Sequence, residues 1–151
     1  MKTNKFNNFI TCLAFLLMCC HGGLALSYTT AGAIDAVGNN AASTILGAVD
    51  CNDDGRGVPA YFVVSFRDKT KTVSGLYMSL HISKDDRMVT VTEISGDSFY
   101  STPLYLYAGP GRYYIAITKT KAGTRLFDVA WYCMTADGKE TGFSFELLQD
   151  H

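Results

Sequence analysis

The sequence predicts an all-β fold: a single β-sandwich of about seven or eight antiparallel strands, with a small β-barrel as the alternative. Two observations carry this prediction. Apolar residues alternate with other residues from residue 60 onward, in runs rich in Val, Ile, Tyr, Phe and Thr. Clusters of Gly, Asp, Ser and Pro separate the runs, as turns separate short strands. At 151 residues the chain has room for one domain.

Each run has one apolar side that we expect to face a common core. In chain order its members are Phe62, Val64, Phe66; Leu76, Met78, Leu80, Ile82; Val89, Val91; Leu104, Leu106; Tyr113, Ile115, Ile117; Phe127, Val129, Trp131, Cys133; and Phe143, Phe145, Leu147. Turn-forming residues lie between the runs at 84–86, 95–97, 108–111 and 121–123. Asp137-Gly138, between two aromatic runs, is typical of a two-residue hairpin.

The N-terminal residues 1–25 are typical of a signal peptide. Lys2 and Lys5 precede an apolar run, Phe9–Cys20, that is too short to span a bilayer, and Ala25 offers a cleavage site. Lipidation at Cys19 or Cys20 is the alternative. Residues 26–48, rich in small and polar residues, are expected to form a flexible or extended lead-in, with a first strand around 44–49. The sandwich domain is then expected at 49–151.

Charge and cysteine content fit export. Without Lys2 and Lys5 the chain has 11 basic and 14 acidic side chains, a balance that predicts no nucleic-acid partner. No apolar stretch after residue 25 is long enough to cross a membrane, so no stable membrane insertion is expected. Removal of residues 1–25 leaves two cysteines, Cys51 and Cys133. In an oxidising compartment such a pair normally forms a disulfide, so we expect a secreted or periplasmic protein. Two buried free thiols are the alternative.

Residues 104–132 (LYLYAGPGRYYIAITKTKAGTRLFDVAWY) show an apolar strand, a Gly-rich turn, a G-x-Y-x-I strand and a closing aromatic strand. This segment resembles the last strands of bacterial pre-peptidase C-terminal domains. The resemblance implies a β-sandwich accessory module attached to, or secreted beside, other exported proteins. It carries over no functional residue.

Five tyrosines lie opposite the expected core side of their strands and are the candidate binding residues: Tyr77, Tyr105, Tyr107, Tyr114 and Tyr132. An aromatic ring with a hydroxyl suits protein interfaces and stacking on sugar rings. The alternative is that tyrosine is simply a preferred strand residue. The leading hypothesis is an exported, non-enzymatic binding or accessory module that recognises a protein or glycan through an aromatic sheet face.

Two further functions belong to other classes. The chain could be a structural or assembly subunit of the cell surface, self-associating through an exposed edge strand. It could also be a small hydrolase using His81, which lies near Ser79 and is followed by Asp85 and Asp86. The sequence contains neither a G-x-S-x-G nor an H-E-x-x-H motif, so we expect a non-enzymatic protein.

One short motif indicates a cation. Asp50, Asn52 and Asp54, followed by Gly55, match the opening of a calcium-binding loop, whose alternating oxygen ligands suit a hard cation. The twelfth position, which is a glutamate in such loops, is Tyr61 here. An ordinary acidic loop is the alternative, because Asp, Asn and Gly favour turns. No other cofactor is expected.

Overall fold

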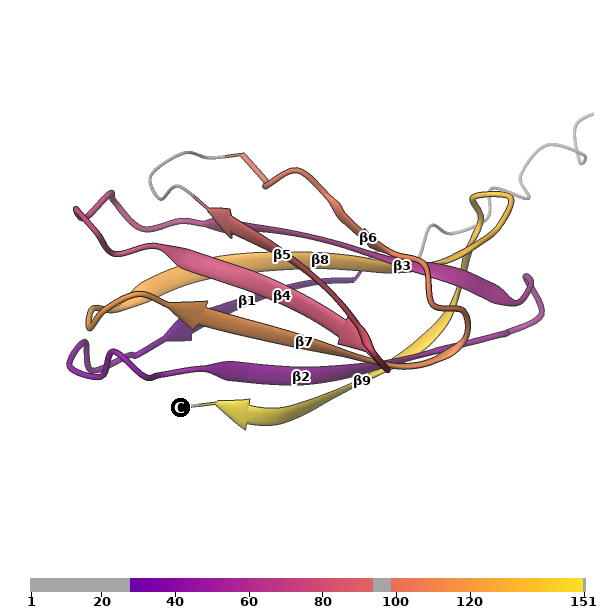
Figure 1. Ribbon diagram of the computed structural model, residues 1–151, viewed down its shortest axis with the longest axis horizontal. Coiled ribbons are helices and arrows are strands. Elements are labelled where there is room, and N and C mark those ends of the chain that lie inside the picture. Colours follow the sequence, from indigo (N-terminus) through magenta and orange to yellow (C-terminus); the bar gives the residue numbers. More distant parts are fainter. Residues whose placement is uncertain (1–27, 94–98, 151) are drawn as a thin grey trace, which may run out of the picture.

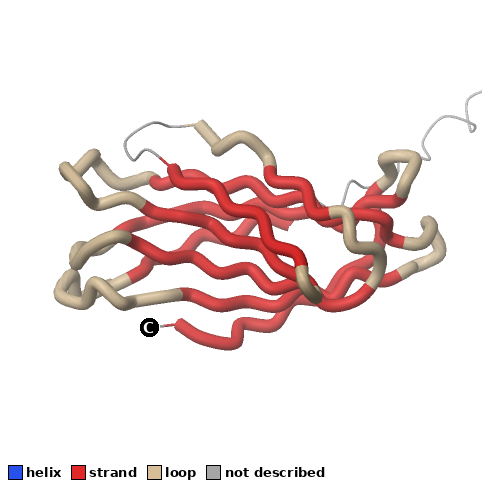
Figure 2. The backbone as a smooth tube through the Cα atoms, in the orientation of Figure 1, coloured by secondary structure: helices blue, strands red, loops and turns tan. Residues whose placement is uncertain are grey.

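The computed structural model describes residues 28–93 and 99–150. The regular secondary structure of these residues consists of strands (Figures 1 and 2). All paired strands run antiparallel. The strands in these residues are β1 (Tyr28–Ile34), β2 (Ile45–Asn52), β3 (Pro59–Asp68), β4 (Met78–Lys84), β5 (Arg87–Glu93), β6 (Leu104–Leu106), β7 (Gly111–Lys119), β8 (Arg125–Thr135) and β9 (Glu140–Asp150). The all-β prediction is confirmed, with one strand more than the seven or eight expected.

The strands form one sheet in the order β5-β4-β7-β2-β9-β8-β3-β6, and β1 pairs with β8. The sheet folds over into two layers. One contains β5, β4, β7, β2 and most of β9, and the other contains β1, β8, β3 and β6. Strand β9 joins the layers, because it pairs with β8 at Cys133↔Thr141 and then crosses to β2 (Figure 1). The result is a flattened, nearly closed barrel, the alternative architecture of the sequence prediction.

Side chains between the layers form one hydrophobic core. The apolar side expected from the sequence is confirmed in β3, β4, β7 and β8, where all its members are buried: Phe62, Val64, Phe66, Met78, Leu80, Ile82, Tyr113, Ile115, Ile117, Phe127, Val129, Trp131 and Cys133. Two residues of β9 that were expected in the core are not buried: Phe145 is 38% exposed and Leu147 is 53% exposed. Both lie beyond the point where β9 leaves β8, and they face the opening between the layers.

Part of the flexible or extended lead-in expected at 26–48 belongs to the sheet. Residues 28–34 form β1, which pairs with β8 from Tyr28↔Trp131 to Ile34↔Arg125. Gly32 stands directly over the ring of Phe127, where a Cβ would come within 2.5 Å of Cζ. The small residues of this segment therefore allow close packing of β1 on the core. The sheet begins at Tyr28, well before the expected domain start at residue 49.

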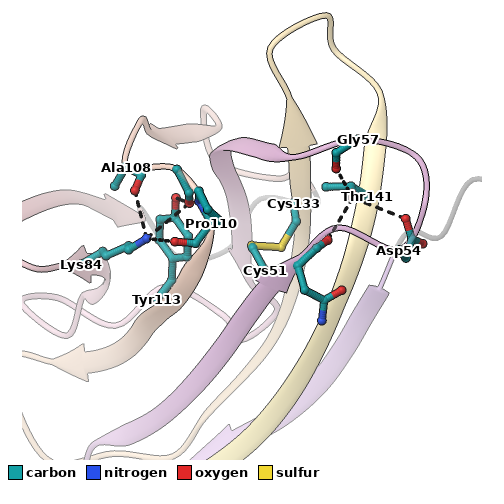
Figure 3. Close-up of a disulfide and its surroundings, with 11 residues drawn as sticks. Cys51, Asp54, Gly57, Lys84, Ala108, Pro110, Tyr113, Cys133 and Thr141 are labelled. Atoms are coloured by element: carbon teal, nitrogen blue, oxygen red, sulfur yellow. Dashed lines mark hydrogen bonds between the residues drawn. A yellow bond between two sulfur atoms is a disulfide. The ribbon is translucent and has the colours of Figure 1, made fainter.

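A disulfide joins the two layers at the end of the barrel where β2 and β8 finish, and these strand ends lie on the right in Figure 1. The bond joins Cys51 of β2 to Cys133 of β8, the pair that the sequence predicted, and their Cα atoms are 5.6 Å apart (Figure 3). The buried Thr141 hydroxyl lies 3.0 Å from the carbonyl oxygen of Asn52 and 2.8 Å from that of Gly57. It thereby fastens the loop between β2 and β3 to β9.

The opposite end is held by two buried ion pairs. Lys119 of β7 and Asp35, which follows β1, are fully buried and lie 2.6 Å apart (Nζ to Oδ2). This pair, like the disulfide, connects the two layers. Arg125 of β8 donates through Nε to Asp68 of β3 at 2.7 Å, and both side chains are fully buried within one layer.

The carboxylate of Asp35 is also the centre of a hydrogen-bond network. It accepts hydrogen bonds from the backbone amides of Gly38, Asn39, Asn40 and Gly123. The hydrogen bond from Lys119 outweighs the effect of burial and, with these amides, holds the pKa of Asp35 far below its ordinary range. Asp35 is therefore ionised wherever the protein is folded near neutral pH.

The expected signal peptide, residues 1–25, lies outside the described residues. Within residues 28–93 and 99–150 there is no helix long and apolar enough to cross a membrane.

Candidate functional site

The candidate site is a group of tyrosines on the outer surface of the layer that contains β3, β6 and β8. Tyr105 of β6 lies opposite Val63 of β3, and Tyr132 of β8 lies opposite Val63 on its other side. Directly opposed residues in a sheet point to the same face, so these three side chains share one surface. Their strand neighbours Phe62 and Leu106 point into the core.

Two further tyrosines complete this surface. The ring of Tyr61 lies 4.9 Å from that of Tyr107 and 6.2 Å from that of Tyr105, measured between centroids. The rings of Tyr105 and Tyr107 are 6.5 Å apart and inclined by 16°. Tyr105 is 48% exposed and Tyr107 is 61% exposed. Tyr61, Tyr105, Tyr107 and Tyr132 together form the tyrosine face.

Two of the five tyrosines expected to act together lie elsewhere. Tyr114 belongs to β7 and Tyr77 immediately precedes β4, so both are in the opposite layer. Alternation within one strand indicates a side but not the neighbouring strand, so the sequence could not separate them from the others. Tyr61 was missed, although its place next to Phe62 gives it the outward orientation.

The backbone that carries the tyrosines is fastened at Tyr107 and two residues after it. The amide of Gly109 donates to the carbonyl of Ala60 at 3.1 Å, which holds the loop after β6 against β3. The guanidinium of Arg87 donates to the carbonyl of Tyr107. The exposed rings therefore stand on a fixed strand and loop.

Lys84 of β4 supports the same loop from inside the barrel (Figure 3). Its ammonium group donates to the carbonyls of Ala108, at 2.9 Å, and Pro110, and it lies 4.9 Å from the centroid of the Tyr113 ring. The Tyr113 hydroxyl donates to the carbonyl of Gly109 at 2.6 Å. Burial raises the pKa of Tyr113, so this donor stays protonated.

A charged cluster lies toward the other end of the same surface. Asp128 of β8 accepts hydrogen bonds from Arg67, at 2.7 and 2.9 Å, and from Lys69, at 3.1 Å. Burial alone would raise the pKa of Asp128, but these cations outweigh burial and lower it. The Arg67 guanidinium also lies 4.8 Å from the centroid of the Tyr100 ring. The layer thus presents exposed aromatic rings beside an ionic cluster of two cations and one carboxylate.

The three residues of the predicted calcium loop have other neighbours. Asp50 lies on β2 and pairs with Arg112 at 3.1 Å, and Asp54 pairs with Arg56 at 3.0 Å. Asn52 ends β2. Among residues 28–93 and 99–150, no group of three or more His, Cys, Asp or Glu side chains is placed to hold a metal ion. Calcium binding stays a prediction.

His81 lies on the outer face of β4 between two threonines. Its Nδ1 is 2.9 Å from the hydroxyl of Thr90, and its Nε2 is 3.0 Å from the hydroxyl of Thr118. The hydroxyl of Ser79 is engaged by Thr92 at 2.8 Å. These contacts give the histidine and serine structural partners on neighbouring strands, rather than joining the two as a nucleophile and its base. The hydrolase reading gains no support from them.

No protein-family model matches the chain, and no curated protein matches it. Among solved structures, a similar one is the Yersinia pseudotuberculosis-derived mitogen (YPM), with a TM-score of 0.44 and 10% sequence identity. The match covers 78% of this chain and 93% of that one. The resemblance of residues 104–132 to pre-peptidase C-terminal domains stays a prediction.

Proposed function

We propose that this protein is an exported, non-enzymatic binding module that recognises a protein or a glycan through the tyrosine face. One observation carries the proposal: the rings of Tyr61, Tyr105 and Tyr107 lie 4.9–6.5 Å apart on one outer surface, and two of them are about half exposed. Aromatic residues that remain exposed side by side on a fixed backbone offer a large contact area with little loss of side-chain entropy on binding.

The chemistry of the face suits either ligand class. Tyrosine rings stack on the apolar faces of sugars or pack in protein interfaces, and their hydroxyls supply hydrogen bonds. The neighbouring cluster of Arg67, Lys69 and Asp128 offers a polar rim. The disulfide between Cys51 and Cys133 supports an oxidising compartment, secreted or periplasmic.

The test compares two double variants of the exported protein. Tyr105→Ser with Tyr107→Ser removes the exposed rings of the tyrosine face. Tyr77→Ser with Tyr114→Ser removes two rings that are 39% and 40% exposed but lie in the opposite layer, and serves as the matched control. Ligands are sought on a glycan array and by crosslinked pull-down from envelope and medium fractions, so that the two ligand classes are distinguished.

We expect the Tyr105 and Tyr107 double variant to lose binding by about 100-fold, because two rings at the centre of a contact contribute most of its free energy. The control should bind as the unmodified protein does. Both variants should keep the Tm within a few degrees. Equal retention by the two variants would refute the tyrosine face as the binding site.

A further inference from the structure

A second candidate binding surface lies at the seam, the opening between β1 and β9 where the two layers separate. Its walls are Thr30 and Gly32 of β1 and Phe145 and Leu147 of β9, with Phe127 behind them. Within the part of the chain that the structure describes, β1 pairs only with β8. From Gly142 onward, β9 pairs only with β2. Each strand therefore turns one edge of backbone N–H and C=O groups toward the seam.

The directions of the two strands define what can fit between them. Both β1 and β9 run antiparallel to β8, so they run parallel to each other. Every strand pair in the sheet is antiparallel. One added strand that runs opposite to both would preserve this pattern, and it would join the two layers on their open side. Direct pairing of β1 with β9 would break the pattern.

The seam has the character of an incomplete core. Phe145 and Leu147 continue the core side of β9, yet they are 38% and 53% exposed. Beside them is a cavity of 150 Å³, about the volume that accommodates a benzene-sized group. Its lining is largely apolar and includes Ala33, Ile45, Phe127, Phe145 and Leu147. A side chain placed there would cover apolar surface that residues 28–93 and 99–150 leave exposed.

Two features of charge distinguish the seam from an ordinary sheet edge. Edge strands commonly carry a lysine or proline that prevents pairing with other chains, but β1 (YTTAGAI) has neither and no charged residue. The cavity has a single charged residue, Asp150, at the end of β9. A strand antiparallel to β9 would place its N-terminal end beside this carboxylate. A basic residue at that end would therefore be complementary to the seam.

We propose that the seam binds a short extended segment of another protein, added as a strand between β1 and β9 and antiparallel to both. The segment has apolar side chains at alternate positions and a basic residue toward its N-terminal end. Backbone hydrogen bonds to β1 and β9 provide affinity, and the cavity selects one apolar side chain. This site lies apart from the tyrosine face and goes beyond the proposed function.

The experiment uses a displayed library of random nine-residue peptides, selected on the exported protein. The test variant is Leu147→Arg, which places a charged side chain at the seam. The matched control is Leu126→Arg, because Leu126 of β8 is 49% exposed, close to the 53% of Leu147, but does not line the cavity. Thermal unfolding of both variants shows that each is folded before binding is compared.

The expected result is a set of enriched peptides that alternate apolar and polar residues and carry Lys or Arg near the N-terminus. They should bind Leu147→Arg at least tenfold more weakly and Leu126→Arg unchanged. Peptides of reversed sequence keep the alternation but should bind a few fold more weakly, because reversal moves the basic residue away from Asp150. Asp150→Asn should weaken the enriched peptides by a few fold.

Three results would overturn the proposal. The first is recovery of no peptide with this alternation, and the second is equal binding to wild type and Leu147→Arg. The third is a dimer of the wild-type protein in sedimentation that becomes a monomer in Leu147→Arg, because a second copy would then cover the seam in place of a foreign strand. Each result is independent of the binding measured for the Tyr105 and Tyr107 variant.

Discussion

The two ends of the barrel are fastened across the layers by different chemistry. At one end the disulfide between Cys51 and Cys133 connects β2 to β8. At the other end the buried pair of Asp35 and Lys119 connects the loop after β1 to β7. The covalent bond acts largely by restricting the unfolded chain, whereas the ion pair acts in the folded state and depends on charge. The two ends should therefore fail under different conditions, one in reductant and the other in acid.

Removal of the disulfide should cause the largest loss in the free energy of unfolding. Its cysteines are 82 residues apart, and chain entropy for a loop of that size corresponds to about 4–5 kcal/mol. We expect Cys51→Ala with Cys133→Ala to lower the free energy of unfolding by that amount, measured by urea denaturation. A loss below about 1 kcal/mol would show that the covalent end contributes little beyond the core.

Disruption of the buried pair of Arg125 and Asp68 should cause the next largest loss in the free energy of unfolding. Asp68→Ala leaves the Arg125 guanidinium buried without its carboxylate, which typically costs about 3–5 kcal/mol. Replacement of both residues, Asp68→Leu with Arg125→Met, should recover most of that loss in the same urea experiment. If Asp68→Ala unfolds at the wild-type urea concentration, the pair does not stabilise this end.

Acid should weaken the pair of Asp35 and Lys119. Because the pKa of Asp35 is lowered in the folded protein, its ionised form contributes stability above the ordinary carboxyl pKa of about 4. That contribution is lost as the pH falls below about 4 toward the folded pKa. The free energy of unfolding should therefore decrease with decreasing pH, and the slope should shrink in Lys119→Met. An unchanged slope in that variant would assign the acid sensitivity to other carboxylates.

The smallest effect is expected at an exposed pair in the hairpin between β8 and β9. A hydrogen bond from Lys139, helped by one from Thr135, lowers the pKa of Asp137 to about 2. Lys139→Ala should raise this pKa toward the ordinary value near 4, as measured by NMR titration of the carboxyl carbon. The urea midpoint should not move, since exposed ion pairs contribute little to stability. This variant is the control for both buried pairs.

The sequence predicted features that are local or paired by chemistry. Alternation identified the core side of β3, β4, β7 and β8, and the cysteine count identified Cys51 and Cys133 as partners. Strand β1 was not predicted from the sequence. Small residues such as Gly32 form a strand here only because they pack against a ring distant in the sequence, that of Phe127.

The same limit applies to the candidate site. Tyr105, Tyr107 and Tyr132 were found by their outward orientation, but Tyr77 and Tyr114 have that orientation too and lie in the other layer. Which outward residues become neighbours depends on strand order, and strand order is set by pairings between distant segments. The pairing of Asp35 with Lys119 is hidden from the sequence for the same reason.

The course of β9 also has a consequence for the order of folding. Its hairpin with β8 is local, but its pairing with β2 joins residues as distant as Ile45 and Asp150. Such long-range contacts form late, because the entropy of closing a long loop must be overcome before they stabilise the chain. During synthesis one edge of β2 would therefore stay unpaired until residues 140–150, which form β9, had emerged. A chain with this strand order cannot complete its sheet until β9 is available.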